Sequence, residues 1–197
     1  MTDPSDIARE MLDMGRRALV GSVAGGVWIA WGLVAARAFA APVLAALVLG
    51  ASLLLVGCAY CIVNGYRSLQ KKHSFAGQSR VSGFLIVTIL EAAGVIGVVL
   101  AAQKTQRLDA LPAWIGLVVG LHFFGLAKVF GVSIYCLTGV SITLWCVLAW
   151  ILFRGNPLII SAGLGVGAIL WATSSFNLFR VLCKAKSGIG LSRRRQA

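Results

Sequence analysis

The sequence has 197 residues, of which 59% are hydrophobic and only 12% are charged, against about 25% charged in an ordinary soluble domain. Its formal net charge is +12, but almost all of the Lys and Arg residues lie between apolar segments or near the chain ends. This composition argues against a water-soluble globule and against nucleic-acid binding. It predicts an integral membrane protein whose cations set the topology and contact anionic lipid headgroups.

Residues 1–17 form the most polar segment of the sequence. The dipeptide Asp3-Pro4 is typical of a helix start, and Ile7 and Met11 would share one face of that helix. We therefore expect a short amphipathic helix on the cytoplasmic membrane surface. A cleavable signal peptide is disfavoured because the start is acidic and the apolar segment that follows is long.

Six apolar segments come next, each with about the 20 residues that a helix needs to cross a bilayer. They cover residues 18–36, 42–66, 81–102, 112–130, 133–153 and 157–179. The fourth and fifth segments are separated by little more than Gly131, and we divide them there because about 40 residues is twice the span of a bilayer. The sequence thus predicts an all-α bundle of six transmembrane helices over residues 18–179, followed by a basic cytoplasmic tail over 180–197.

The distribution of Lys and Arg predicts the orientation of the chain. If the N-terminus is cytoplasmic, most of the 18 Lys and Arg residues also lie on the cytoplasmic side. The residues left on the outer side are Arg37, Lys104, Arg107 and Arg154. The candidate contacts for anionic headgroups or for a partner protein are Arg67, Lys71, Lys72, Arg193, Arg194 and Arg195. Both termini are therefore expected in the cytoplasm.

Glycines recur at regular spacings in the apolar segments. In three helices a proline at the outer start is followed eight residues later by a glycine: Pro42 and Gly50, Pro112 and Gly120, Pro157 and Gly165. This pattern suggests three helical hairpins of common origin, and chance in a glycine-rich chain is the alternative. Three small-xxx-small pairs are Gly21 and Gly25, Gly116 and Gly120, Gly163 and Gly167. They indicate close packing within the bundle or, alternatively, formation of a homo-oligomer.

One acidic residue, Glu91, lies inside an apolar segment, near the middle of the third predicted helix. A charged side chain at that depth costs on the order of 2.5–3.5 kcal/mol on insertion scales. Glu91 should therefore face the bundle interior and be paired or protonated. Thr88 lies one turn away on the same face and is a further candidate for this site.

His122 lies at a similar depth in the fourth predicted helix, and consecutive antiparallel helices are usually neighbours. Three interpretations stay open. Glu91 and His122 form a hydrogen-bonded pair that only fixes helix register, or they form a protonatable site coupled to movement of a solute or proton. In the third interpretation they do not touch. A metal site is disfavoured because two ligands fall short of the usual three or four.

Other motifs give little support for catalysis or for a bound cofactor. Cys58 and Cys61 form a Cys-x-x-Cys pair, but both lie within the second apolar segment and are interpreted as small core residues. The sequence contains no phosphate-binding loop, no His-Glu-x-x-His and no Gly-x-Ser-x-Gly. We expect neither an enzyme nor a cofactor.

The segment Gly120-Leu121-His122-Phe123, with the residues Gly125 to Phe130, resembles a motif in small uncharacterised six-helix bacterial membrane proteins. In that motif a Gly-x-His-Phe or Gly-x-His-Leu also begins the inner half of a helix. A proline often follows the aromatic pair there, where this chain has Gly125. The resemblance implies a bacterial inner membrane and suggests no function.

Two functions are therefore compatible with the sequence. The first is a small carrier or channel for a solute or ion, with a protonatable site at Glu91 and His122. The second is a membrane scaffold, sensor or accessory subunit whose partner contacts the loop 67–80 and the tail 180–197. The sequence identifies neither a solute nor a partner protein.

Overall fold

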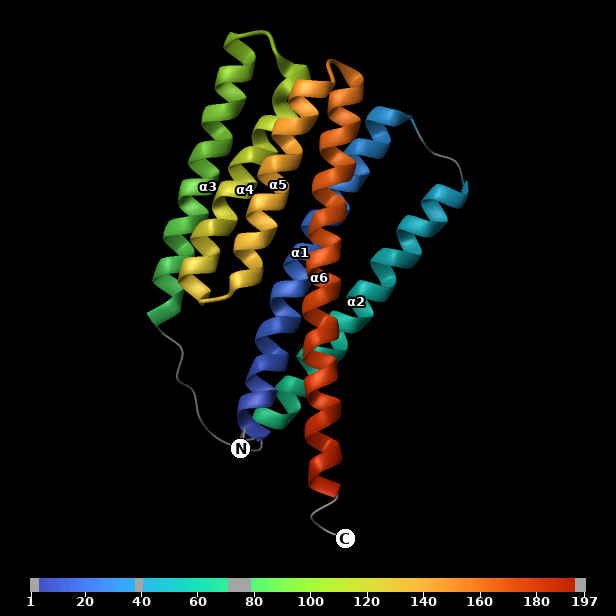
Figure 1. Ribbon diagram of the computed structural model, residues 1–197, viewed down its shortest axis with the longest axis vertical. Helices are drawn as coiled ribbons and strands as arrows, with labels where there is room; N and C mark the ends of the chain where they lie inside the picture. Colours follow the sequence, from blue (N-terminus) through green and yellow to red (C-terminus); the bar gives the residue numbers. More distant parts are fainter. Residues whose placement is uncertain (1–3, 38–40, 71–78, 194–197) are drawn as a thin grey trace. The chain divides into compact units, whose positions relative to one another are not determined.

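The computed structural model describes the backbone of residues 4–37, 41–70 and 79–193, and the side chains of residues 8–37, 42–67 and 83–184 (Figure 1). The helices in these ranges are α1 (Pro4–Ala36), α2 (Ala41–Gln70), α3 (Ser79–Lys104), α4 (Leu111–Phe130), α5 (Ser133–Leu152) and α6 (Asn156–Arg193). A short 3₁₀ turn, η1 (Leu108–Ala110), precedes α4. Each predicted apolar segment falls on a separate helix, which confirms the all-α prediction.

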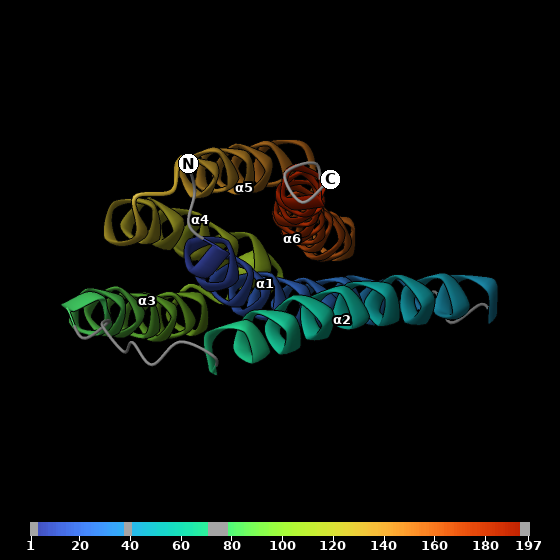
Figure 2. The ribbon, with the colours of Figure 1, turned by 90° about the horizontal axis from the view of Figure 1, so that it is seen from below.

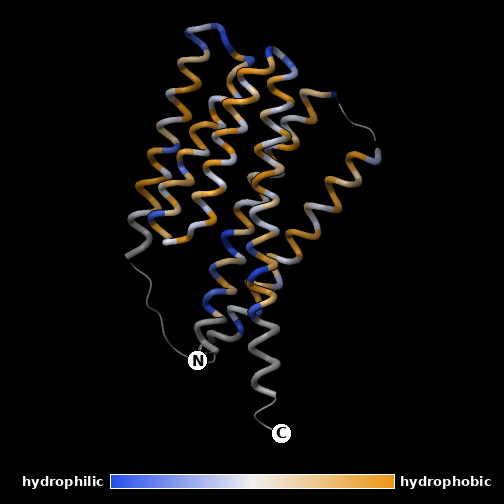
Figure 3. The backbone as a smooth tube through the Cα atoms, viewed as in Figure 1, coloured by the Kyte–Doolittle hydropathy of each residue, from blue (hydrophilic) through white to orange (hydrophobic). Residues whose placement is uncertain are grey.

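All six helices of the described chain are long and apolar enough to cross a membrane. Hydrophobic residues follow most of their length, and hydrophilic ones gather toward their ends (Figure 3). Large apolar side chains such as Leu53, Leu90 and Leu144 stay exposed on the helix surfaces. Water would disfavour so much exposed apolar surface, and lipid removes this penalty. The chain is therefore a multi-pass integral membrane protein.

Two helices are longer than the sequence suggested. The structure joins the predicted surface helix over residues 1–17 to the first apolar segment, so that α1 is continuous from Pro4 to Ala36. Likewise, α6 extends past residue 179 to Arg193, and the first part of the tail is helical. No proline interrupts either stretch after its first turn, and a change from apolar to charged residues does not by itself end a helix.

The boundary between α4 and α5 lies where the sequence placed it. Gly131 has a φ of 64°, and its N–H donates to the carbonyl of Ala127, which ends α4 with a left-handed residue. Glycine adopts this conformation without steric penalty, whereas residues with a Cβ rarely do. A single glycine thus converts one long apolar stretch into two spans.

The contacts divide the chain into two units, and α1, α2 and α6 contribute to both. The first unit contains the described residues of 1–24, 44–75 and 171–197. Its buried core is built by Met11, Ala18, Leu54, Cys58, Cys61, Leu178 and Val181. The indole N–H of Trp171 donates to the carbonyl of Ser22 at 2.9 Å, and Gly50 packs against the Trp171 ring. This unit holds the N-terminal part of α1 against α2 and α6.

The second unit contains the described residues of 25–43 and 76–170, and therefore all of α3, α4 and α5. Figures 1 and 2 show α4 between α3 and α5. Small residues allow close approach: Gly116 faces Cys146, and Gly120 faces Gly139 on α5. This confirms the prediction that the Gly116 and Gly120 pair packs inside the bundle.

The third small-residue pair also lies in a helix contact within the second unit. Gly163 packs against Gly32, and Gly167 packs against Ile29, which brings α6 and α1 together. Gly165 faces the ring of Trp145, whose N–H donates to the carbonyl of Ser161 at 2.9 Å. The glycine of each proline–glycine pair thus contacts a neighbouring helix, while a common origin of the three hairpins stays a prediction.

Candidate functional site

Glu91 and His122 meet across the contact between α3 and α4. The Nδ1 atom of His122 lies 3.2 Å from Oε2 of Glu91. The imidazole keeps 10% of its side-chain surface exposed and the carboxylate 28%. Among the three interpretations of the sequence, the one in which the residues do not touch is therefore wrong. The carboxylate of Glu91 faces a polar partner, as the insertion penalty requires.

The pair interrupts a ladder of glycine–valine contacts between the two antiparallel helices. In this ladder the smallest residue on one helix faces a branched residue on the other: Gly83 and Val129, Val87 and Gly125, Gly94 and Val118. A Cβ atom on Gly94 or Gly125 would lie 2.9 Å from a valine methyl carbon. The Glu91–His122 contact occupies one step of this ladder, so the backbones hold the two polar side chains at close range.

The hydrogen-bond partners of Nδ1 define the tautomer of the histidine. Nδ1 also lies 3.4 Å from the carbonyl oxygen of Val87, one turn before Glu91. The backbone carbonyl has no proton to give, and an ionised carboxylate likewise only accepts hydrogen bonds. The geometry is therefore satisfied when Nδ1 carries the proton and donates it. This arrangement fixes the ring and leaves Nε2 as the basic nitrogen.

Thr88 does not join the pair through its hydroxyl. Its Oγ1 atom donates to the carbonyl of Phe84, one turn earlier in α3, at 3.0 Å. Back-bonding of this kind is common for threonine inside helices, because the hydroxyl reaches the preceding turn. The structure thus supports Glu91 and His122 as one site, and places the hydroxyl of Thr88 in a local helix bond.

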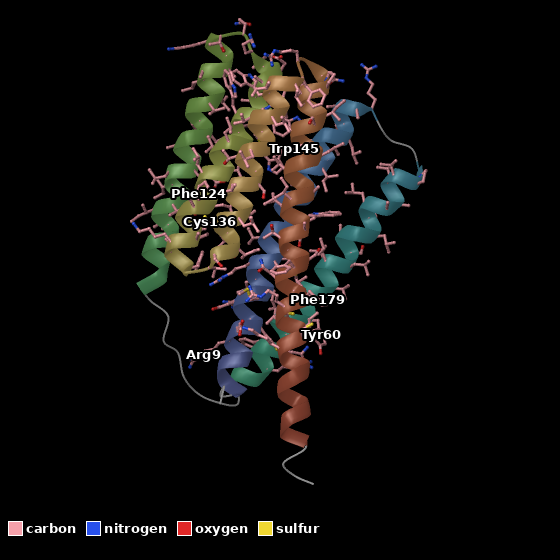
Figure 4. All side chains as sticks on the ribbon, viewed as in Figure 1. Arg9, Tyr60, Phe124, Cys136, Trp145 and Phe179 are labelled. Atoms are coloured by element: carbon pink, nitrogen blue, oxygen red, sulfur yellow. The ribbon has the colours of Figure 1, made fainter. Side chains whose placement is uncertain are left out.

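Aromatic side chains extend from the pair along the α4–α5 contact. His122 meets the edge of Phe123, and Tyr135 on α5 packs edge-on against both Phe123 and Phe130. Phe124 follows on α4, and Figure 4 labels it together with Cys136 on the neighbouring helix. Phe123 is thus the ring that contacts His122, and it gives the imidazole an apolar neighbour in addition to its carboxylate partner.

Two features of the helix contacts around the pair were not found from the sequence. The Val87 carbonyl is a backbone group, and only the α3–α4 register places it beside His122. Thr143 on α5 lies against Gly120, and its hydroxyl is buried without a hydrogen-bond partner. The glycine–valine spacing along two consecutive antiparallel helices was the signal that could have given the register.

The basic residues predicted to contact headgroups or a partner are only partly described. Arg67 is exposed in the last turn of α2. Arg193 is the last residue of α6. Lys71, Lys72, Arg194 and Arg195 lie outside the described residues. The proposed role of this group stays a prediction.

Cys58 and Cys61 are fully buried in the core of the first unit. All five cysteines are free thiols, and within the described residues no group of three or more His, Cys, Asp and Glu side chains could hold a metal ion. The Cys-x-x-Cys pair packs among Met11, Ala18 and Leu178. Its surroundings are those of core residues.

A groove opens on the first unit between α2 and α6, with a volume of about 430 Å³. Its walls are mostly apolar, and they include Leu53, Trp171, Ser175 and Phe179; Figure 4 labels Phe179 on α6. Glu91 and His122 do not line this groove. The candidate site therefore consists of the α3–α4 pair, and the groove is a separate feature of the surface.

Comparisons with known proteins give no independent assignment. A scan of protein-family models matches no family, and searches of curated proteins and of solved structures find no similar protein. The candidate site therefore depends on its own geometry and chemistry.

Proposed function

We propose that this protein moves a small solute or ion across a bacterial inner membrane, with the Glu91–His122 pair as its protonatable site. The excess of Lys and Arg on one side supports cytoplasmic termini. The resemblance of the Gly120–Phe123 segment to a bacterial motif supports the membrane assignment. Six helices are few for an alternating-access carrier, which favours a homo-oligomer.

The observation that carries this proposal is the position of the pair within an otherwise apolar ladder. Glycine–valine contacts lie on both sides of Glu91 and His122. The two helices could therefore pack at this step with apolar residues, as they do at the neighbouring steps. A buried ion pair is weak evidence for stability, because the desolvation penalty offsets the attraction between the charges. Ionisable residues inside spanning helices typically belong to ion or proton pathways.

The unequal exposure of the two side chains also supports a role in ion movement. Glu91 keeps more than a quarter of its side-chain surface exposed, whereas His122 is almost enclosed by its neighbours. If the pair only fixed helix register, we would expect both side chains to be fully buried. The exposed part of the carboxylate lets the pair be reached without separating the two helices.

Proton flux into reconstituted vesicles tests this proposal. The full chain is placed in liposomes that contain a pH-sensitive dye, and a potassium gradient with valinomycin supplies the driving potential. We expect acidification that depends on the protein and is abolished in Glu91→Gln, which is close in shape but cannot ionise. Asp13→Asn is the matched control, because Asp13 is an exposed carboxylate on α1 in the first unit, whereas the pair belongs to the second. Equal flux in native and Glu91→Gln vesicles would reject the proposal.

A further inference from the structure

We propose that the ion bound by this pair is the proton and that it is taken up at Nε2 of His122. In this assignment Glu91 stays ionised and, together with the Val87 carbonyl, holds the imidazole ring as a positioning group. The inference rests on the proposed function, since it specifies which ion the site binds and which atom binds it.

The first step is the assignment of the proton already on the ring. Nδ1 of His122 has Glu91 Oε2 at 3.2 Å and the Val87 carbonyl at 3.4 Å. A neutral imidazole has one donor and one acceptor nitrogen. Two acceptors facing Nδ1 make it the donor, and the lone pair is then on Nε2. Nε2 has no hydrogen-bond partner among the described residues.

The second step is the charge balance of proton uptake. With a neutral ring, the pair carries the single negative charge of Glu91. A proton from water forms a new N–H bond at the Nε2 lone pair, no bond within the protein breaks, and the ring becomes an imidazolium. The pair is then neutral as a whole. A pair without net charge is better tolerated in an apolar environment than one that carries a net charge.

The third step excludes the metal cations that carriers often use. Hard cations are held by several oxygen ligands. Here Oε2 of Glu91 already receives the N–H of His122, and the Thr88 hydroxyl donates to the Phe84 carbonyl. Within the described residues no group of three or more His, Cys, Asp and Glu side chains surrounds the pair, and an imidazole nitrogen is a poor ligand for such ions. The donor set therefore suits a proton.

Among the titratable groups described on the helices that pack against α4, Glu91 is the one that contacts the His122 ring. From α3 the facing charged group is Glu91. On α5, the stretch that contacts the same part of α4 contains Gly139 and Thr143, which do not titrate. Tyr135 and Cys136 lie earlier in α5, and Tyr135 packs against Phe123 and Phe130. Cys146 lies farther along α5 and faces Gly116.

Nitrogen NMR of the full-length protein in nanodiscs tests this assignment. Ring-¹⁵N histidine is incorporated, and His73→Gln removes the signal of the other histidine in the sequence. At alkaline pH we expect the Nδ1–H tautomer of His122. On acidification Nε2 should gain a proton while the carboxyl carbon of Glu91, labelled with ¹³C, keeps the shift of an ionised group. An Nε2–H tautomer, or protonation of Glu91 before the ring, would overturn the inference.

Two substitutions of Glu91 separate its roles. Glu91→Gln keeps an oxygen that accepts the Nδ1–H, so the tautomer should persist although proton flux is lost. Glu91→Leu removes the acceptor, and a mixture of tautomers should appear. An unchanged tautomer in Glu91→Leu would remove Glu91 as a positioning group. A ring spectrum that changes when sodium chloride replaces choline chloride would contradict the assignment to the proton.

These measurements do not depend on transport. Absence of proton flux with the expected tautomer rejects the proposed function and leaves the ring assignment in place. Proton flux with the opposite tautomer rejects the ring assignment alone.

Discussion

Gly94 on α3 lies so close to Val118 on α4 that a Cβ atom on Gly94 would come within 2.9 Å of a valine methyl carbon. This contact is the step of the ladder next to the Glu91–His122 pair. The small size of Gly94 lets the backbones of α3 and α4 approach closely. This close approach contributes to the 3.2 Å distance between Nδ1 of His122 and Oε2 of Glu91. Residues without ionisable or reactive side chains thus position Glu91 and His122 through their packing.

The first prediction concerns this close approach. Gly94→Leu should destabilise the protein by about 1–3 kcal/mol, the usual range for overpacking a well-packed contact. A decrease of several degrees in Tm, measured in detergent, should follow. Gly97→Leu is the matched control, since a Cβ atom on Gly97 meets nothing within 4 Å. Equal Tm values for the two variants would show that the α3–α4 contact is looser than the Gly94–Val118 distance indicates.

A second prediction distinguishes stability from function at the pair. Either Glu91→Leu or His122→Leu leaves a polar group without its partner, which costs about 1–3 kcal/mol. The double variant restores an apolar contact in the ladder and should recover most of that loss. Unfolding in detergent measures all three proteins. A double variant that is stable but carries no protons would show that the pair serves function, whereas additive losses in stability would indicate a structural role.

The sequence brought Glu91 and His122 to a similar depth on neighbouring helices, and left their contact as two of three open interpretations, because both features behind it are local. Helix length fixes their depth, and consecutive antiparallel spans are neighbours. Thr88 was grouped with them from helical spacing alone, but spacing gives the face of a residue and not the bond that its hydroxyl makes. The Val87 carbonyl and the orientation of the ring depend on helix register, which is set by glycine contacts at many positions at once.

Helix ends were harder to predict than helix centres. Apolar length identified the spans, but α1 and α6 continue into charged sequence, where backbone hydrogen bonds persist after the hydropathy signal has ended. The division at Gly131 was predicted because about 40 apolar residues are twice the span of a bilayer, and the structure adds that Gly131 ends α4 in a left-handed conformation. Sequence patterns thus determine which residues lie in lipid better than they determine where a helix stops.

The third prediction tests the turn at Gly131. Gly131→Ala forces a residue with a Cβ into a φ of 64° and should destabilise the protein by about 1–2 kcal/mol. Gly26→Ala is the control, because Gly26 lies inside α1 and a Cβ atom there would meet nothing within 4 Å. Alanine at that position should raise helix stability by about 0.5–1 kcal/mol. Opposite shifts in Tm are expected, and shifts of the same sign would contradict the backbone assignment.

The last prediction concerns the basic tail and the alternative function as a scaffold or accessory subunit. Lys184 on α6 pairs with Glu10 on α1 at 2.5 Å, and both side chains are partly exposed, so the pair contributes at most about 1 kcal/mol. Deletion of residues 187–197 leaves this pair intact but removes Arg193, Arg194 and Arg195. We therefore expect an unchanged Tm.

The same truncation should weaken contact with anionic headgroups, because each arginine near a charged membrane surface contributes about 1 kcal/mol. Native mass spectrometry of the purified protein, with anionic and zwitterionic phospholipids added in equal amounts, measures this loss. The triple substitution of Arg193, Arg194 and Arg195 by Gln in the full-length chain should reproduce it, since the effect depends on charge. If the truncated chain keeps its preference for anionic lipid, the tail is not the contact surface. Normal proton flux in the truncated protein would show that transport depends on the helices and does not need a partner protein bound to the tail.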